Sequence, residues 1–261
     1  EQLIDRGHSF RTASDTEVLL EAYLEWGVDC VDHLNGMFAF GLYDHAERRL
    51  FLARDRAGEK PLFYRHDRGT LWFASELKAL LAHDEMPREL DYGALEYYLA
   101  YGYVPRDRCI LRDYHKLPQG HAAVYRIAQD ELSVRRYWQL PPSTERTRMS
   151  VDEASRRAEF LLERAVRRQL VADVPVGVLL SGGLDSSLIT ALAARSSSAP
   201  VRTFTVTFPG HGNLDEGPHA RRVAEYFGTE HTELEGMQTT IEMIPRLARQ
   251  FDEPIADPAI V

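Results

Sequence analysis

The fold is decided by residues 176–187, which have the sequence VGVLLSGGLDSS. An apolar run of strand length is followed by Gly182 and Gly183, and then by residues that can open a helix at or near Asp185. Glycine lets the backbone approach a ligand closely, and the amides at a helix N-terminus favour an anion. The stretch therefore predicts a strand–loop–helix unit that binds phosphate or pyrophosphate.

The loop differs from two common phosphate-binding motifs. It has no lysine, so it is not a Walker A loop, and its glycines lack the spacing of a dinucleotide-binding turn. Asp185 fits a phosphate site if it acts through Mg²⁺. The alternative is a glycine-rich turn in which Ser and Asp only cap the helix. The run Ser-Gly-Gly-Leu-Asp-Ser directly after an apolar strand favours the phosphate site.

The residues around this loop predict alternating strands and helices. We expect helices over 152–170, 187–194 and 218–227, and strands over 176–180 and 201–208. Strands and helices that alternate at this spacing are typical of parallel βαβ units.

The first half of the chain has a different pattern. Apolar runs over 37–43 and 50–53, and again over 61–64 and 71–74, predict two antiparallel hairpins. Ser14 and Glu17 have the spacing of a capping box at the start of a helix. Further helices are expected from Ser75 and over 91–100, with a strand over 121–126. The proline-bearing, polar stretch 141–147 predicts a linker.

Composition limits the classes of partner. The 261 residues carry 31 Lys and Arg against 40 Asp and Glu, a net charge of −9, which argues against nucleic-acid binding. Two cysteines cannot build a disulfide framework or a four-thiolate zinc site, and they fit a reducing, cytoplasmic setting. The longest apolar run, 174–180, is too short for a membrane span, and the first residues do not resemble a secretory signal.

Several motifs together carry a family resemblance. Residues 181–186 (SGGLDS) resemble the pyrophosphate loop of ATP pyrophosphatases. The flanking stretches resemble the glutamine-dependent asparagine synthetase family: 173–180 (DVPVGVLL), 204–208 (FTVTF) and 252–254 (DEP). Four earlier stretches of this sequence resemble the late part of that family's glutaminase domain: 14–18, 34–40, 54–62 and 73–80.

The resemblance implies two partial domains. Residues 1–140 would be the C-terminal part of an α+β N-terminal-nucleophile glutaminase, an αββα sandwich. Residues 141–150 would be the linker. Residues 151–261 would begin an α/β, doubly wound parallel-sheet ATP-pyrophosphatase domain. We therefore expect an internal portion of a longer enzyme, without the N-terminal cysteine nucleophile and without glutaminase or synthetase activity of its own.

The resemblance also implies an activity and its ligands. The whole protein would adenylate a carboxylate, most simply aspartate, with ATP and Mg²⁺, and ammonia from glutamine would attack the acyl-adenylate, releasing AMP and PPi. Another carboxylate acceptor, or a nucleotide-binding fragment without turnover, is the alternative. The expected setting is cytoplasmic, without nucleic acid or membrane, and a homodimer stays open.

Individual residues take roles from the same resemblance. Asp15 would pair with the glutamine α-ammonium, although it could instead only support the helix start. Leu179 and Val206 would contact adenine through their backbones, a role compatible with a place in the strand core. Asp185 would hold Mg²⁺. The remaining nucleotide-binding residues would be Ser181, Gly182, Gly183, Leu184, Ser186 and Ser187.

Overall fold

The computed structural model describes residues 1–105, 107–142, 149–210, 215–236 and 241–256. Two compact units divide the chain. The first comprises Glu1–Pro142 together with Thr240–Val261, and the second comprises Ser143–Thr239.

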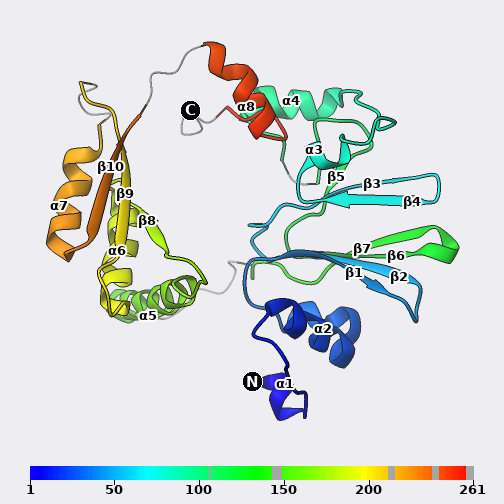
Figure 1. Cartoon of the computed structure of the whole chain (residues 1–261), viewed down its shortest axis with the longest axis horizontal. Helices are drawn as coiled ribbons and strands as arrows, with labels where there is room; N and C mark the ends of the chain where they lie inside the picture. Colours follow the sequence, from blue (N-terminus) through cyan, green and yellow to red (C-terminus); the bar gives the residue numbers. More distant parts are fainter. Residues whose placement is uncertain (106, 143–148, 211–214, 237–240, 257–261) are drawn as a thin grey trace. The chain divides into compact units, whose positions relative to one another are not determined.

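The first unit contains two antiparallel sheets (Figure 1). One has the order β1-β2-β6-β7 and is built from β1 (Ala39–Asp44), β2 (Arg49–Arg54), β6 (His121–Arg126) and β7 (Glu131–Arg136). The other has the order β4-β3-β5 and is built from β3 (Phe63–Asp67), β4 (Thr70–Ala74) and β5 (His115–Lys116). Both predicted hairpins, β1–β2 and β3–β4, are confirmed.

Apolar clusters show how these layers pack. Leu52 and Ala123 of the first sheet meet Leu62 and Leu117, which flank strands of the second, so the sheets face each other. The outer face of the first sheet packs on α2 (Asp15–Trp26) and on the 3₁₀ helix η1 (Gly27–Asp32). The outer face of the second packs on α3 (Leu77–Leu80) and α4 (Tyr92–Tyr101). The order is helix, sheet, sheet, helix.

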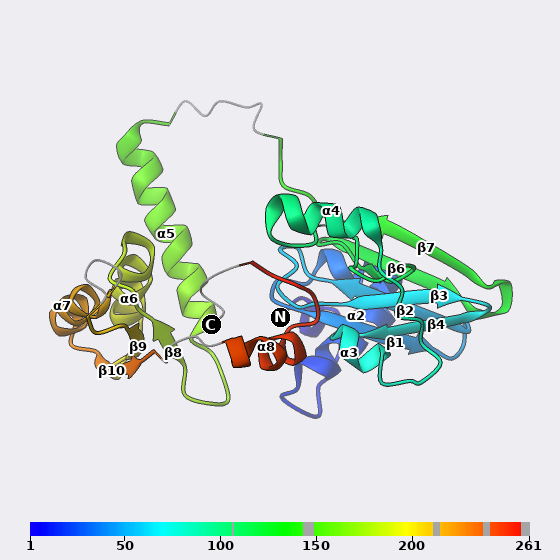
Figure 2. The ribbon, with the colours of Figure 1, turned by 90° about the horizontal axis from the view of Figure 1, so that it is seen from above.

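The second unit contains a parallel sheet of order β10-β9-β8. It is built from β8 (Gly177–Leu179), β9 (Arg202–Thr207) and β10 (Glu230–Glu235). Helices α6 (Leu184–Ser196) and α7 (Gly217–Phe227) pack on the sheet, and the long helix α5 (Val151–Gln169) packs on α6, as Figure 2 shows. The predicted parallel β–α alternation is confirmed.

Short elements complete the described chain. They are α1 (Gln2–Asp5), the 3₁₀ helices η2 (Ile127–Gln129) and η4 (Ile241–Met243), and α8 (Ile244–Gln250). The sequence did not predict α8, β7 or β10. No helix among the described ranges is long and apolar enough to cross a membrane.

The segment 241–256 bears on the domain organisation. It packs in the first unit, on the side of α3 and α4 (Figures 1 and 2), through hydrogen bonds to residues 78, 102, 110 and 116. The expected division at 141–150 stays a prediction, and residues 143–148 of that linker lie outside the described residues. The structure adds that chain from beyond the linker returns to the first unit.

Candidate functional site

The glycine loop after β8 is held by its own serines. The Ser186 hydroxyl accepts a hydrogen bond from the Ser181 N–H (3.2 Å), and the two hydroxyls lie 2.8 Å apart. The Ser181 hydroxyl also accepts from the Gly183 N–H (3.2 Å). These bonds fix the turn between β8 and α6 before any ligand binds.

Close packing explains the first glycine of the loop. Gly182 has φ +76°, and a Cβ there would lie 2.6 Å from the Ala220 nitrogen of α7. No side chain caps α6, whose N-cap is Gly183. Its first amides therefore remain available for an anion.

A cavity of about 390 Å³ lies beside the loop. Its lining includes Gly182 and Ser187 of the loop and two basic side chains of α7, His219 and Arg222, which are hydrogen-bonded to each other. No local pattern in the sequence pointed to Arg222, because the contact between the loop and α7 is tertiary. Basic side chains beside free helix amides suit a phosphate group.

The two expected adenine-contacting residues lie on one face of the sheet. Leu179 pairs with Phe204, and Val206 is two residues further along the same strand. These two residues are 80% and 48% exposed, so the expectation that they lie in the strand core is wrong. The reason is that α6 and α7 cover the opposite face, where Leu180, Thr203 and Thr205 are buried.

The loop offers limited ligands for Mg²⁺. Asp185 is an exposed residue in the first turn of α6. No group of three or more His, Cys, Asp or Glu side chains in the described ranges could hold a metal ion. One carboxylate beside serine hydroxyls fits a magnesium ion held mainly by phosphates and water, with Asp185 as the protein's contribution.

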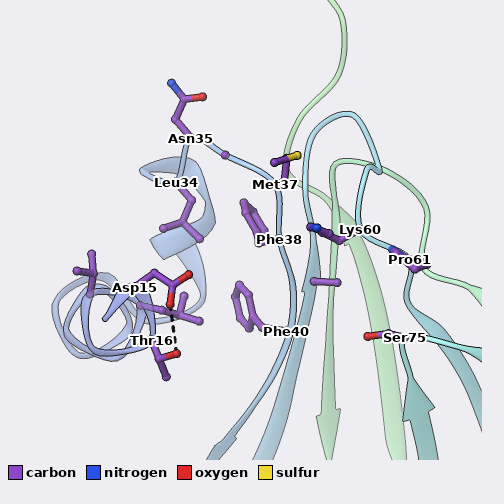
Figure 3. Close-up of a pocket in the computed structure, with 14 residues that line it drawn as sticks. Asp15, Thr16, Leu34, Asn35, Met37, Phe38, Phe40, Lys60, Pro61 and Ser75 are labelled. Carbon is purple, nitrogen blue, oxygen red and sulfur yellow. Dashed lines mark hydrogen bonds between the residues drawn. The ribbon is translucent and has the colours of Figure 1, made fainter. Parts of the chain in front are cut away.

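The first unit has a separate cavity of about 630 Å³ around Asp15 (Figure 3). Asp15 is the first residue of α2, and its carboxylate points toward the cavity wall formed by Phe38 and Phe40. Lys60 and Ser75 line the other side. The cavity therefore combines an apolar wall with one acidic and one basic group, a combination suited to an amino acid.

The start of α2 differs from the predicted capping box. Ser14 accepts from the Thr16 N–H (3.2 Å), but Glu17 bonds to the Arg11 and Thr12 amides and to the Thr12 hydroxyl. The Thr12 hydroxyl, followed by the two amides, lowers the pKa of Glu17. The glutamate thus holds the segment before the helix and keeps Asp15 in place at the cavity.

A buried carboxylate shapes the opposite wall. Asp55 is 1% exposed and accepts hydrogen bonds from the amides of Phe38 (3.3 Å), Ala57 (3.1 Å), Glu59 (3.0 Å) and Lys60 (3.0 Å). Phe38 and Lys60 both line the cavity. Asp55 is therefore a positioning residue of the cavity wall.

Neither cysteine has the character of a nucleophile. Cys30 and Cys109 are fully buried, and burial raises their pKa to about 11 and about 12. Thiols with such pKa values stay protonated near neutral pH.

Comparison with known proteins shows which families the two parts of the chain match. Residues 1–138 match the model of the glutamine amidotransferase domain, and residues 157–261 match that of asparagine synthase. The chain is 39% identical to asparagine synthetase [glutamine-hydrolyzing] 3 of Bacillus subtilis, over 88% of this chain and 39% of that protein. It is 34% identical to putative asparagine synthetase [glutamine-hydrolyzing] 2 of Methanocaldococcus jannaschii, over 94% of this chain and 48% of that protein.

The match over the first unit places the chain in the glutamine amidotransferase class of proteins. The second unit adds a parallel sheet with a phosphate-type loop. The chain belongs to the glutamine-dependent asparagine synthase family. It spans 39% and 48% of the length of the two relatives named above.

Proposed function

We propose that the whole protein is a glutamine-dependent amidotransferase that makes asparagine from aspartate, ATP and glutamine. The observation that carries this proposal is the Ser181–Ser187 loop, with its uncapped α6 amides, in one chain with a glutamine amidotransferase domain. In this assignment the first unit has the N-terminal-nucleophile αββα fold, and the second begins a doubly wound ATP-pyrophosphatase domain.

Asp15 is proposed to pair with the α-ammonium of glutamine. Support comes from its place at the rim of a cavity with room for an amino acid. The loop residues 181–187 would hold the ATP phosphates, with Asp185 on Mg²⁺. The exposed sheet face at Leu179 and Val206 would receive the adenine through backbone groups.

Calorimetry with MgPPi tests the nucleotide site on the 261-residue chain. Wild type should bind, and Asp185→Ala should weaken binding at least tenfold, because the metal loses its protein ligand. Glu225→Ala, which removes an exposed carboxylate from α7, is the matched control and should bind as wild type does. Equal affinity in all three forms would favour the alternative that the loop is a structural turn.

The acceptor is tested separately on the whole protein. PPi release with ATP and glutamine should require a carboxylic acid, and aspartate should support the fastest release. If another acid supports release and aspartate does not, the protein is a family member that amidates a different carboxylate. The expected cytoplasmic location and the open question of a homodimer remain parts of this proposal.

A further inference from the structure

A short segment that begins at the last residue of α8 contacts the rest of the first unit at several points. Residues 250–256 lie within the part of the sequence that matches asparagine synthase. In space they belong to the first unit, most of which matches the glutamine amidotransferase domain. We call residues 250–256 the tie segment.

The shortest hydrogen bonds of the tie segment are made by Glu253. One carboxylate oxygen of Glu253 accepts from the Ile110 N–H (2.7 Å), and the other accepts from the Lys116 ammonium (2.6 Å). Lys116 also donates to the Val104 carbonyl (2.6 Å). The side chains of Glu253 and Lys116 are only 13% and 14% exposed. Both oxygens of the carboxylate and the charge of the lysine are therefore satisfied away from water.

Other residues of the tie segment add contacts on two helices. Asp252 accepts from the Lys78 N–H (3.1 Å) in the single turn of α3, and the Lys78 ammonium donates to the Gln250 carbonyl (3.0 Å). The Ala256 N–H donates to the carbonyl of Gly102 (2.8 Å), the C-cap of α4. The tie segment is thus held by α3, by α4 and by residues 110–116.

One of these contacts involves a residue that is close in the sequence to the wall of the Asp15 cavity. Ser75 lines that cavity. Lys78 is three residues later, and its N–H donates the hydrogen bond to Asp252. A displacement of the tie segment would therefore act on the chain that forms the cavity wall. A buried ion pair favours one geometry, because loss of either partner leaves the other charge unpaired.

We propose that Glu253, through Lys116, is the positioning residue of an internal tie that keeps glutamine hydrolysis coupled to amide synthesis. The tie holds synthetase-type sequence on the unit that would release ammonia, and that physical link is what would couple the two reactions. The coupling role rests on the proposed amidotransferase function. The docking of the tie segment does not depend on that function and is measured separately.

Hydrogen exchange on the 261-residue chain tests the docking. Glu253→Gln keeps an acceptor for the Ile110 amide but removes the charge that pairs with Lys116. We expect the amides of Lys78, Ile110 and Ala256 to exchange at least tenfold faster in this variant. Glu242→Gln, an exposed residue of η4 just before α8, is the matched control and should exchange as wild type does.

A double variant separates the ion pair from general damage. Lys116→Met with Glu253→Gln removes both charges and retains most of the lysine stem, so it should restore exchange to within a few-fold of wild type. Two results would overturn the docking role. One is unchanged exchange in Glu253→Gln, and the other is an equal rise at the remote Phe51 and Leu52 amides of β2.

The coupling is tested in the whole protein by the amount of glutamate formed per PPi released. Wild type should give a ratio near one, and Glu253→Gln should raise it at least threefold, with ammonia-driven synthesis unchanged. An unchanged ratio, or an equal fall in ammonia-driven synthesis, overturns the coupling role. If wild type releases no PPi with any acid, the proposed function fails and coupling fails with it, while the exchange measurements still decide the docking.

Discussion

At the scale of single residues, Asp55 shows how a charge with no catalytic role supports a site. Its carboxylate lies in the core of the first unit and joins Phe38 to the loop 56–60 through backbone amides. Arg54 holds the same loop from outside, by donating to the carbonyls of Gly58 and Lys60. The shape of the Asp15 cavity therefore depends on two residues of which neither lines it.

Asp55→Asn should lower the free energy of unfolding of the first unit by about 2 kcal/mol. The amide nitrogen of asparagine is a donor, so it faces backbone N–H groups that need an acceptor. Urea denaturation followed by tryptophan fluorescence measures the effect. Asp84→Asn, an exposed aspartate in the same unit, is the control and should change stability by less than about 0.5 kcal/mol.

The effect of Asp55 should depend on pH. Burial alone would raise the pKa of Asp55, but the backbone N–H donors, led by those of Lys60 and Glu59, outweigh burial and lower it. A lowered pKa means that the stabilisation is complete above the ordinary value of about 3.9 and is lost as pH falls through the folded-state value. The difference between wild type and Asp55→Asn should shrink below about pH 4, and a difference independent of pH would contradict this assignment.

Two glycines separate backbone strain from close packing. Gly182 and Gly210 both have positive φ, +76° and +87°, but a Cβ at Gly182 meets the backbone of α7 and one at Gly210 meets nothing within 4 Å. Gly182→Ala should therefore destabilise the second unit more than Gly210→Ala does, by about 1–3 kcal/mol. It should also weaken MgPPi binding, and equal effects of the two variants in thermal unfolding and calorimetry would count against the packing argument.

At the scale of elements, α5 shows a complete capping box. Ser150 accepts from the Glu153 N–H, and Glu153 accepts from the Ser150 N–H (2.9 Å). These Ser150 bonds lower the pKa of Glu153. The helix begins where the sequence also carries Asp152 in the first turn, and it ends with Arg167 and Arg168, so both ends suit the helix dipole.

Ser150→Ala should cost about 1 kcal/mol of stability in the second unit, because the Glu153 amide loses its acceptor. Ser155→Ala, in the second turn of the same helix, is the matched control and should be neutral or slightly stabilising. Far-UV circular dichroism during urea denaturation reports the helix content. Equal shifts for the two variants would show that the cap contributes nothing measurable.

At the scale of the whole molecule, the two units should unfold in two steps. All three tryptophans, Trp26, Trp72 and Trp138, lie in the first unit, whereas α5, α6 and α7 lie in the second. Tryptophan fluorescence should follow the first unit alone, and far-UV circular dichroism should follow both. Asp55→Asn should shift the fluorescence transition, and Ser150→Ala should shift only the circular dichroism. Coincident transitions that both variants shift together would indicate one cooperative unit.

Local chemistry let the sequence predict much of the fold. Apolar runs separated by turn residues predicted β1–β4, and the strand–glycine–helix pattern predicted β8, the loop and α6. Strands β7 and β10 lacked such a signal, because most of their residues are polar and exposed. Each is held in its sheet by pairing with a neighbouring strand, β6 for β7 and β9 for β10. The capping box at Ser14 was also misjudged, because Glu17 found better donors at Arg11 and Thr12.

The sequence by itself determined the two kinds of unit, the phosphate-type loop and the place of Asp15 at a helix start, because each depends on neighbours within a few residues. Only the tertiary structure decided that Arg222 lies beside the loop, that Leu179 and Val206 are exposed, and that Glu253 pairs with Lys116. Lys116 and Glu253 are 137 residues apart in the chain. Such contacts follow from how elements pack, which no local pattern of residues encodes.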